Sequence, residues 1–307
     1  HKPMTERQRG LTFATITATS WAVLAIALKY VVTYISAGSI VWFRMAVAFL
    51  GLFLFYLIKS PHSLKILFSR PWLAVLAGLF LSFNYYGFMK GIELTTASNA
   101  QIMIQMAPMT LILIGILYFK EVPSSQQKLG FLLAISGFSL FYWDQLESLP
   151  THPSALQMGN LWIIGAALTW ALFATFQKIL LSKWTPQQIN LVIYGVSTLF
   201  LFPLATPIEF STLPINAWII LIFLGMNTVI AYGSLGEALK RAPASQVSVI
   251  VSANPLLTLS ILAILHALDF DVIKHEPVHS VGYFGAALVI SGVICTVLKN
   301  KPVSSQE

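Results

Sequence analysis

The sequence predicts an all-α integral membrane protein with ten transmembrane helices, arranged as two inverted five-helix repeats. Three observations support this fold class. Only 9% of the 307 residues are charged and 57% are hydrophobic, whereas a soluble domain carries about 25% charged residues. Ten apolar runs are long enough to cross a bilayer. Motifs of the first five runs recur in the same order in the last five.

The ten expected spans follow from length and hydrophobicity, because a bilayer core needs about 20 predominantly apolar residues per helix. The first run is too long for a cleavable signal peptide, so we expect it to remain as a span. The connections are short, and none is long enough for a separate soluble domain. The expected spans are residues 11–34, 38–58, 71–91, 96–118, 127–143, 158–182, 187–207, 215–238, 243–266 and 280–298.

Basic and acidic residues separate onto two sides when successive spans alternate in direction. One side receives fourteen of the eighteen Lys and Arg residues, and the other clearly holds only Lys274. Because cytoplasmic loops carry the excess of Lys and Arg, we expect both termini in the cytoplasm. The fourteen are Lys2, Arg7, Arg9, Lys59, Lys65, Arg70, Lys120, Lys128, Lys178, Lys183, Lys240, Arg241, Lys299 and Lys301. The opposite side receives Asp144, Glu147, Glu209, Asp269, Asp271 and Glu276.

The repeat is visible in four pairs of spans. Ser20-Trp21-Ala22 in the first span resembles Thr169-Trp170-Ala171 in the sixth, and Gly130 in the fifth resembles Gly285 in the tenth. Between them, an offset of 147 positions aligns Gly78 with Gly225, Tyr85 with Tyr232, Ala97 with Ala244, Ser98 with Ser245 and Pro108 with Pro255.

Each half therefore contains five spans. Five is an odd number, so the second half enters the membrane from the opposite side, and such inverted repeats place a substrate site near the midplane between the halves. We expect a first repeat over residues 11–145 and a second over 158–298. Cytoplasmic tails of residues 1–10 and 299–307 flank them.

These motifs resemble the drug/metabolite transporter (DMT) superfamily, and the EamA-like branch of metabolite and amino-acid exporters in particular. The resemblance rests on two five-span halves, a Trp-Ala motif in the first span of each, and Ala-Ser before a proline-containing fourth span. It implies a central cavity lined by the first, third and fourth spans of each half. Small four-helix multidrug relatives carry a membrane glutamate in the first span, but residues 11–32 contain no carboxylate here.

Polar side chains on the fourth span of each half are the first candidates for substrate binding. Gln101 and Gln105 are four residues apart and share one helical face, and their repeat partners are Ser248 and Ser252. We expect the two faces to meet across a shared cavity. The alternative interpretation is that they join helices, at about 0.6 kcal/mol per hydrogen bond.

Pro108 and Pro255 lie well inside their runs. Proline removes a helical hydrogen bond and kinks the helix, which predicts either a hinge for alternating access or a purely architectural bend. Asn254 precedes Pro255 and is a candidate to contact the freed carbonyls or the substrate.

Aromatic residues inside the spans are a third set of candidates. Trp21 and Trp170 lie away from the interfaces where Trp usually anchors a membrane protein, and an indole N–H needs a partner. Tyr85 and Tyr232 occupy repeated positions, and Asn84 adds an amide beside Tyr85. All five are expected to line the cavity, with core packing as the alternative.

Arg44 is the most conspicuous charge within a span. A charge at this depth is a functional hypothesis by default. Arg44 either attracts an anionic group or extends to the headgroups on the outer side. Lys29 and Lys90 are expected to extend to the headgroups. Glu237 is expected to pair with Lys240 or Arg241, one turn away.

Two enzyme signatures are rejected. His275-Glu276-Pro277-Val278-His279 matches the letters of a zinc-protease motif, but that chemistry needs a continuous helix and Pro277 disfavours it at Glu276. No phosphate-binding loop motif occurs. We therefore expect no enzyme activity, no cofactor, no metal and no nucleic-acid partner.

The sequence thus predicts a secondary transporter of small metabolites, most of all amino acids, that works by alternating access. An exporter of drugs or of other metabolites such as nucleosides is the alternative. The expected setting is a bacterial inner membrane with its lipids, and one ten-span chain can form the whole unit as a monomer.

Overall fold

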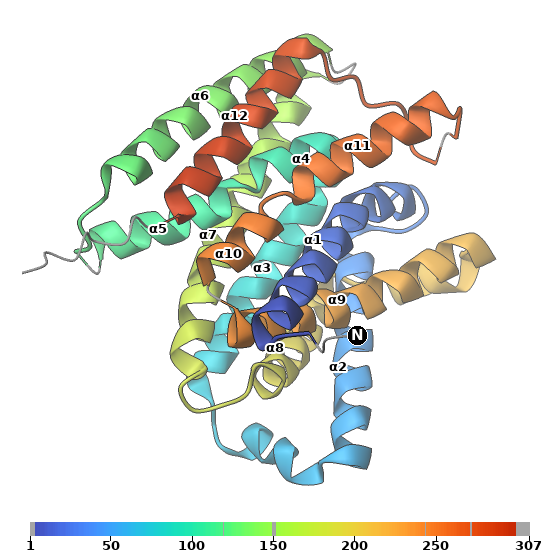
Figure 1. The fold of residues 1–307 in the computed structure, drawn as a ribbon. Helices are drawn as coiled ribbons and strands as arrows, with labels where there is room; N and C mark the ends of the chain where they lie inside the picture. Colours follow the sequence, from blue (N-terminus) through green and yellow to red (C-terminus); the bar gives the residue numbers. More distant parts are fainter. Residues whose placement is uncertain (1–3, 119, 149–151, 243, 271, 299–307) are drawn as a thin grey trace, which may run out of the picture.

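The computed structural model describes residues 4–118, 120–148, 152–242, 244–270 and 272–298, and helices dominate it (Figure 1). Among these residues, ten segments are long and apolar enough to cross a membrane. The predicted all-α membrane architecture of ten spans is confirmed. Of the predicted tails, residues 1–3 and 299–307 lie outside the described residues.

The helices begin and end within six residues of the predicted spans. Thr5 caps the first helix by accepting a hydrogen bond from the Gln8 backbone N–H, so residues 6–10 of the expected tail are helical. The first half comprises α1 (Glu6–Val31), α2 (Ala37–Lys59), α3 (Trp72–Leu94), α4 (Ala97–Met103), α5 (Met106–Leu117) and α6 (Ser125–Ser148). The second comprises α7 (Pro153–Leu180), α8 (Pro186–Leu201), α9 (Ile215–Arg241), α10 (Ala244–Val251), α11 (Asn254–Ala267) and α12 (Ser280–Val297).

The two halves pack as matching partners. The first helix of each half lies against the third of the other, so that α1 packs on α9 and α7 packs on α3. The second helices, α2 and α8, contact each other, as do the fifth helices, α6 and α12. This exchange is what an approximate two-fold relation between the halves requires, and it brings both halves to every major interface.

The α6–α12 pair stands at one edge of the bundle (Figure 1). Its closeness depends on glycine, because a Cβ added to Gly137 would lie 2.6 Å from the Gly285 carbonyl oxygen, and one added to Gly130 would lie 2.6 Å from that of Gly292. Small residues allow membrane helices to approach in this way.

Two ends of the bundle differ in charge. We call the end that holds the α1–α2, α3–α4, α6–α7, α8–α9 and α11–α12 connections the acidic face, and the opposite end the basic face. The helix flanks between them expose large apolar side chains, such as Leu54, Leu132 and Phe284. In water such a surface would be unfavourable, whereas lipid chains solvate it.

Candidate functional site

The fourth span of each half is broken into two helices, as the prolines predicted. α4 ends at Met103 and α5 begins at Met106, while α10 ends at Val251 and α11 begins at Asn254. Pro108 and Pro255 lie in the first turn of the second segment, where a missing N–H is least costly. The carbonyl of Ile104, four residues before Pro108, accepts a hydrogen bond from Ala107 N at 2.8 Å. A role as a moving hinge stays a prediction.

Gln101 joins three helices at the centre of the molecule. Its Nε2 donates to the Trp21 carbonyl at 2.8 Å and to Thr258 Oγ1 at 3.0 Å. Thr258 in turn donates to the Ala22 carbonyl at 2.9 Å. α1 is thereby held between α4 and α11. Gln101 joins helices in this structure, and its contact with a substrate stays a prediction.

The remaining polar candidates of the fourth spans make fewer hydrogen bonds than Gln101. Gln105 is buried, and its Nε2 makes one long contact, 3.4 Å, to the Gln101 carbonyl. Asn254 is buried with no hydrogen-bond partner for its Oδ1 among the described residues. Ser252 is buried and Ser248 is half-buried. Gln101 therefore meets Thr258 rather than either serine, while Gln105 and Asn254 keep unused hydrogen-bonding capacity.

Aromatic rings from three helices surround Tyr232 of α9. Trp21 of α1 approaches it edge-on at 5.6 Å between ring centroids, Phe173 of α7 lies at 6.0 Å, and Tyr85 of α3 lies at 6.3 Å. Trp170 continues the cluster through Phe173, at 6.4 Å. The structure thus brings together four of the predicted aromatic candidates in a single cluster, in which Tyr85 and Tyr232 are buried and Trp21 and Trp170 are half-buried. This cluster is here called the aromatic centre.

Arg44 adjoins the aromatic centre. The side chain is only 2% exposed, and its guanidinium carbon lies 4.3 Å from the centroid of the Tyr85 ring. The Tyr85 hydroxyl contacts Thr228 Oγ1 at 3.5 Å. Arg44 therefore points inward, and the alternative in which it extends to the outer headgroups is wrong.

Asn84 points away from the aromatic centre, and its contact illustrates the repeat. Its Nδ2 donates to the Ala166 carbonyl of α7 at 2.9 Å. In the matching interface, Thr17 of α1 contacts the carbonyl of Ala231, the repeat partner of Asn84, at 3.3 Å. The two interfaces thus carry a hydrogen bond at the same place, but the donor is an amide in one and a hydroxyl in the other. This match supports a packing role for Asn84.

Several residues at the centre were not predicted. Thr258, Thr228 and Phe173 have no matching side chain at the repeated position, so a search for repeated polar or aromatic residues passes over them. Tyr194 of α8 is fully buried, and its hydroxyl has no hydrogen-bond partner among the described residues. No local sequence signal distinguishes it from an ordinary core tyrosine.

Charged side chains form hydrogen bonds with helix ends at the acidic face. Glu276, from the α11–α12 connection, accepts hydrogen bonds from Ala97 N, Ser98 N and Ser98 Oγ at the start of α4, at 2.8, 2.9 and 2.6 Å. Lys29 donates to the Ile92 and Thr95 carbonyls at the end of α3, at 2.9 and 2.7 Å. The prediction that Lys29 extends to the headgroups is therefore wrong, because helix-end carbonyls satisfy its ammonium group.

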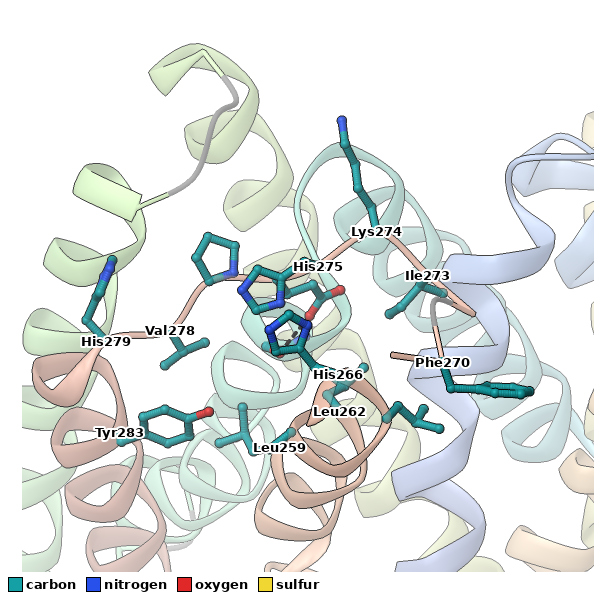
Figure 2. A pocket seen from close by; sticks show the side chains of 15 residues that line it. Leu259, Leu262, His266, Phe270, Ile273, Lys274, His275, Val278, His279 and Tyr283 are labelled. Carbon is teal, nitrogen blue, oxygen red and sulfur yellow. Dashed lines mark hydrogen bonds between the residues drawn. The ribbon is translucent and has the colours of Figure 1, made fainter. Parts of the chain in front are cut away.

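The segment with the letters of the zinc motif forms part of this face. His275 stacks on His266 of α11 at 3.9 Å between ring centroids. Figure 2 shows the two rings together among the side chains that line a pocket, with Leu259, Phe270 and Tyr283. His279 instead lies beside Asp144, with 3.4 Å between Nδ1 and Oδ1. The two histidines of the motif thus have separate partners, and the segment is extended rather than helical.

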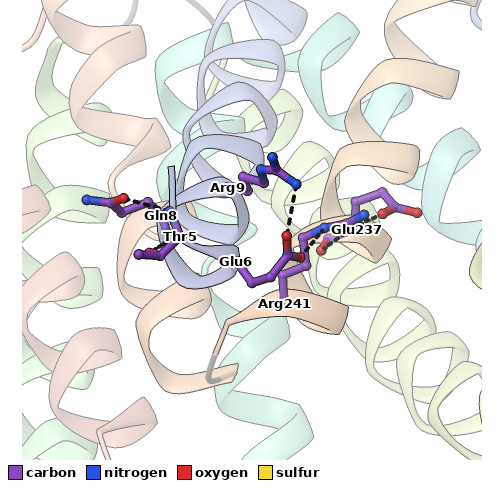
Figure 3. Close-up of polar contacts among 6 residues, drawn as sticks. All are labelled: Thr5, Glu6, Gln8, Arg9, Glu237 and Arg241. Carbon is purple, nitrogen blue, oxygen red and sulfur yellow. Dashed lines mark hydrogen bonds and ion pairs between the residues drawn. The ribbon is translucent and has the colours of Figure 1, made fainter. Parts of the chain in front are cut away.

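At the basic face, Arg241 joins the two halves. It pairs with Glu237 on its own helix and with Glu6 of α1, whose carboxylate lies 3.3 Å from Arg241 Nε (Figure 3). The predicted pairing of Glu237 is confirmed for Arg241. Gly10 packs directly against Ala242 at this point, which brings α1 and α9 close together.

Ten spans in two matching halves, with broken fourth spans beside a buried polar and aromatic centre, define the class of two-half membrane transporters. The chain belongs to the EamA-like transporter family, whose profile matches residues 8–143 and again residues 157–298, once in each half. This family consists of transporters rather than enzymes, so the predicted resemblance and the predicted absence of enzyme activity are both confirmed.

Two bacterial relatives match nearly the whole chain. An uncharacterized transporter of Haemophilus influenzae is 32% identical over 95% of this chain and 95% of its own length. The uncharacterized inner membrane transporter YhbE of Escherichia coli K12 is 31% identical over 95% of this chain and 92% of its own. One solved crystal structure, 15% identical, superposes with a TM-score of 0.64 over 93% of this chain and 95% of that one. That likeness supports the fold alone.

Proposed function

We propose that this protein is a secondary transporter that moves amino acids across a bacterial inner membrane by alternating access, as a monomer. Membership of a transporter family gives the general activity. The inner membrane is suggested by the relative YhbE, which is an inner membrane transporter. The basic face is cytoplasmic in this proposal, because Lys and Arg collect on the cytoplasmic side of membrane proteins.

The observation that carries the proposal is the composition of the centre. Both halves contribute to it, through Trp21 and Tyr85 from one and Trp170 and Tyr232 from the other. Gln105 and Asn254, at the two breaks in the fourth spans, keep unused polar atoms. Inverted-repeat transporters bind substrate at such broken helices near the midplane. An amino acid needs polar contacts for its ends and apolar surface for its side chain, and this centre contains both.

The orientation has an independent test. A reporter enzyme that is active only outside the cytoplasm, fused after Asp144 or after Pro214, should be active, whereas a fusion after Lys59 or Lys183 should be inactive. The reverse pattern would contradict the assignment of the basic face to the cytoplasm.

Uptake into proteoliposomes tests the transport proposal. Purified protein reconstituted into vesicles preloaded with one unlabelled amino acid should exchange it for the labelled form, faster than protein-free vesicles do. A panel of the twenty amino acids identifies the substrate. No exchange with any of them contradicts the amino-acid proposal.

A drug or nucleoside exporter is the second candidate, favoured by the large aromatic surface around Tyr232. The same vesicles, loaded with labelled nucleosides or with a fluorescent aromatic cation, distinguish it. Transport of these compounds without any amino-acid exchange would replace the first proposal with the second.

A further inference from the structure

We propose that Arg44 binds a carboxylate group of the transported molecule, with the aromatic centre beside it receiving the rest of that molecule. This inference rests on the proposed function and specifies the chemistry of its site. It starts from the state of Arg44 in the structure, in which a positive charge is enclosed within the protein and its hydrogen-bonding capacity is unused.

The enclosure of Arg44 is close to complete, with 2% of the residue exposed. Its Nε has no hydrogen-bond partner among the described residues. The ion pairs among the described residues involve Arg9, Lys90, Arg241 and His279, and none of them includes Arg44. The Tyr85 ring, 4.3 Å away, is its clearest favourable contact.

The described residues do not compensate for burying the positive charge of Arg44. Arg does not lose its proton in proteins, and burying a charge is unfavourable unless it is paired and hydrogen-bonded. A cation–π contact with one tyrosine compensates for only part of that cost. Charged residues inside membrane spans usually pair with another group. The missing partner is therefore an anion that is not part of the described chain.

The shape of the guanidinium selects the kind of anion. Its N–H groups form a planar fork that matches the two oxygens of a carboxylate. A second donor comes from α8, which packs against both α2 and α3, because the Tyr194 hydroxyl is buried without a hydrogen-bond partner among the described residues. Two unsatisfied donor groups on neighbouring helices suit one anionic group that accepts from both.

The position of Arg44 fits a substrate site. It is the eighth residue of α2, so it lies about 10 Å along the axis from the acidic-face end at 1.5 Å per residue. Its stacking partner Tyr85 contacts Tyr232, which contacts Trp21 and Phe173. A molecule whose carboxylate meets Arg44 would therefore place its apolar part against these rings.

Thermal stability without ligand separates this role from a structural one. If Arg44 serves to bind a substrate anion, Arg44→Met removes an unfavourable buried charge while keeping an unbranched apolar side chain, and the Tm of the protein without substrate stays equal or rises by a few °C. If the stack on Tyr85 is structural, the Tm falls, and a fall of several °C would overturn the proposal. Lys59→Gln, which removes an exposed charge from the end of the same helix, is the matched control.

Ligand binding provides the second measurement. Each of the twenty amino acids and its amide, in which the carboxylate is neutralised, is added to the purified protein, and the Tm shift is recorded. The expected result is stabilisation by at least one amino acid and binding of its amide at least about tenfold weaker. Arg44→Gln should abolish the difference, while Arg44→Lys, which keeps the charge but not the fork, should retain part of it.

Other results of the binding measurement separate the carboxylate site from the transporter proposal. Equal binding of the acid and the amide, or unchanged binding by Arg44→Gln, overturns the carboxylate site but leaves the transporter proposal standing. Stabilisation by chloride with no response to amino acids means that Arg44 holds an inorganic anion, and this also overturns it. No response to acids or amides, together with no exchange in proteoliposomes, overturns both proposals.

Discussion

Arg44 is buried and Glu276 is half-buried, and the two charged groups differ in how far the described residues satisfy them. Glu276 accepts three hydrogen bonds at the start of α4, all at 2.9 Å or less. Arg44 has a tyrosine ring on one side and no hydrogen-bond partner for its Nε among the described residues. Donors of the first half thus satisfy Glu276 of the second half, whereas no described residue does the same for Arg44 Nε.

The difference indicates which charges maintain the fold and which serve another purpose. A carboxylate at a helix N-terminus satisfies free N–H groups and interacts favourably with the helix dipole. Glu209 does the same at the start of α2, where Ser36 Oγ and Ser39 Oγ each donate to it at 2.7 Å. Glu276 and Glu209 are thus hydrogen-bonded at helix ends of the acidic face, whereas Arg44, Tyr194 and Asn254 each keep a buried polar atom without a hydrogen-bond partner among the described residues.

Removing the Glu276 carboxylate should have the largest effect on stability. Glu276→Ala leaves three donors at the start of α4 without an acceptor, and we expect unfolding to become easier by about 2–3 kcal/mol. Glu276→Gln keeps one acceptor oxygen and should lose less. Thermal melting of the purified protein checks this, with Glu147→Ala, an exposed carboxylate of the same face, as the control. A melting temperature equal to that of the control would contradict the cap.

Substitutions at the centre should have the reverse profile, with reduced transport and intact stability. Gln105→Ala and Trp170→Ala each remove a contact available to the substrate but few contacts within the fold, so we expect transport about tenfold slower, equivalent to about 1.4 kcal/mol. Expression and melting temperature should stay at the wild-type level. Exchange rates in proteoliposomes measure the effect, and Leu113→Ala, on the exposed flank of α5, is the control. Normal transport by both variants would show that the site is elsewhere.

Substitution of Glu209 should have the smallest effect on stability, and this effect should depend on pH. Partial burial acts to raise the pKa of Glu209, but hydrogen bonds from Ser39 and Ser36 outweigh it and lower the pKa below its ordinary value. A lowered pKa in the folded protein means that the stabilisation is present above the unfolded pKa, about 4.3, and is lost as the pH falls through the folded one.

The corresponding measurement compares wild type and Glu209→Gln across pH. At pH 7 the variant should be less stable by less than about 1 kcal/mol, because the carboxylate is partly exposed. The two melting temperatures should converge below about pH 4. A difference that grows as the pH falls would have the wrong sign and would contradict the assigned hydrogen bonds.

The sequence was sufficient for features that depend on local chemistry. Hydrophobicity located the ten spans, the repeat identified their order, and Pro108 and Pro255 predicted the breaks in the fourth spans. The pairing of Glu237 with Arg241 followed from one turn of helix. Each of these depends on residues close together in the chain or on a repeated pattern.

Features that depend on distant contacts were not predictable in the same way. Glu276 caps a helix that begins 179 positions earlier, so its neighbours in sequence give no sign of its partner. Whether Arg44 turned inward or outward depended on Tyr85 of another helix. Thr258 bonds to Gln101 although the repeat pointed to Ser248 and Ser252, because the two halves match in position but not in residue type.

The central claim is that Arg44 lacks a partner because the substrate provides one. The most direct test is the ratio of exchange rates for the best transported amino acid and its amide, measured in proteoliposomes with wild type and Arg44→Gln. The account predicts that wild type prefers the acid at least about tenfold and that the ratio in Arg44→Gln falls to about one. A variant that transports with the wild-type preference intact would contradict the claim.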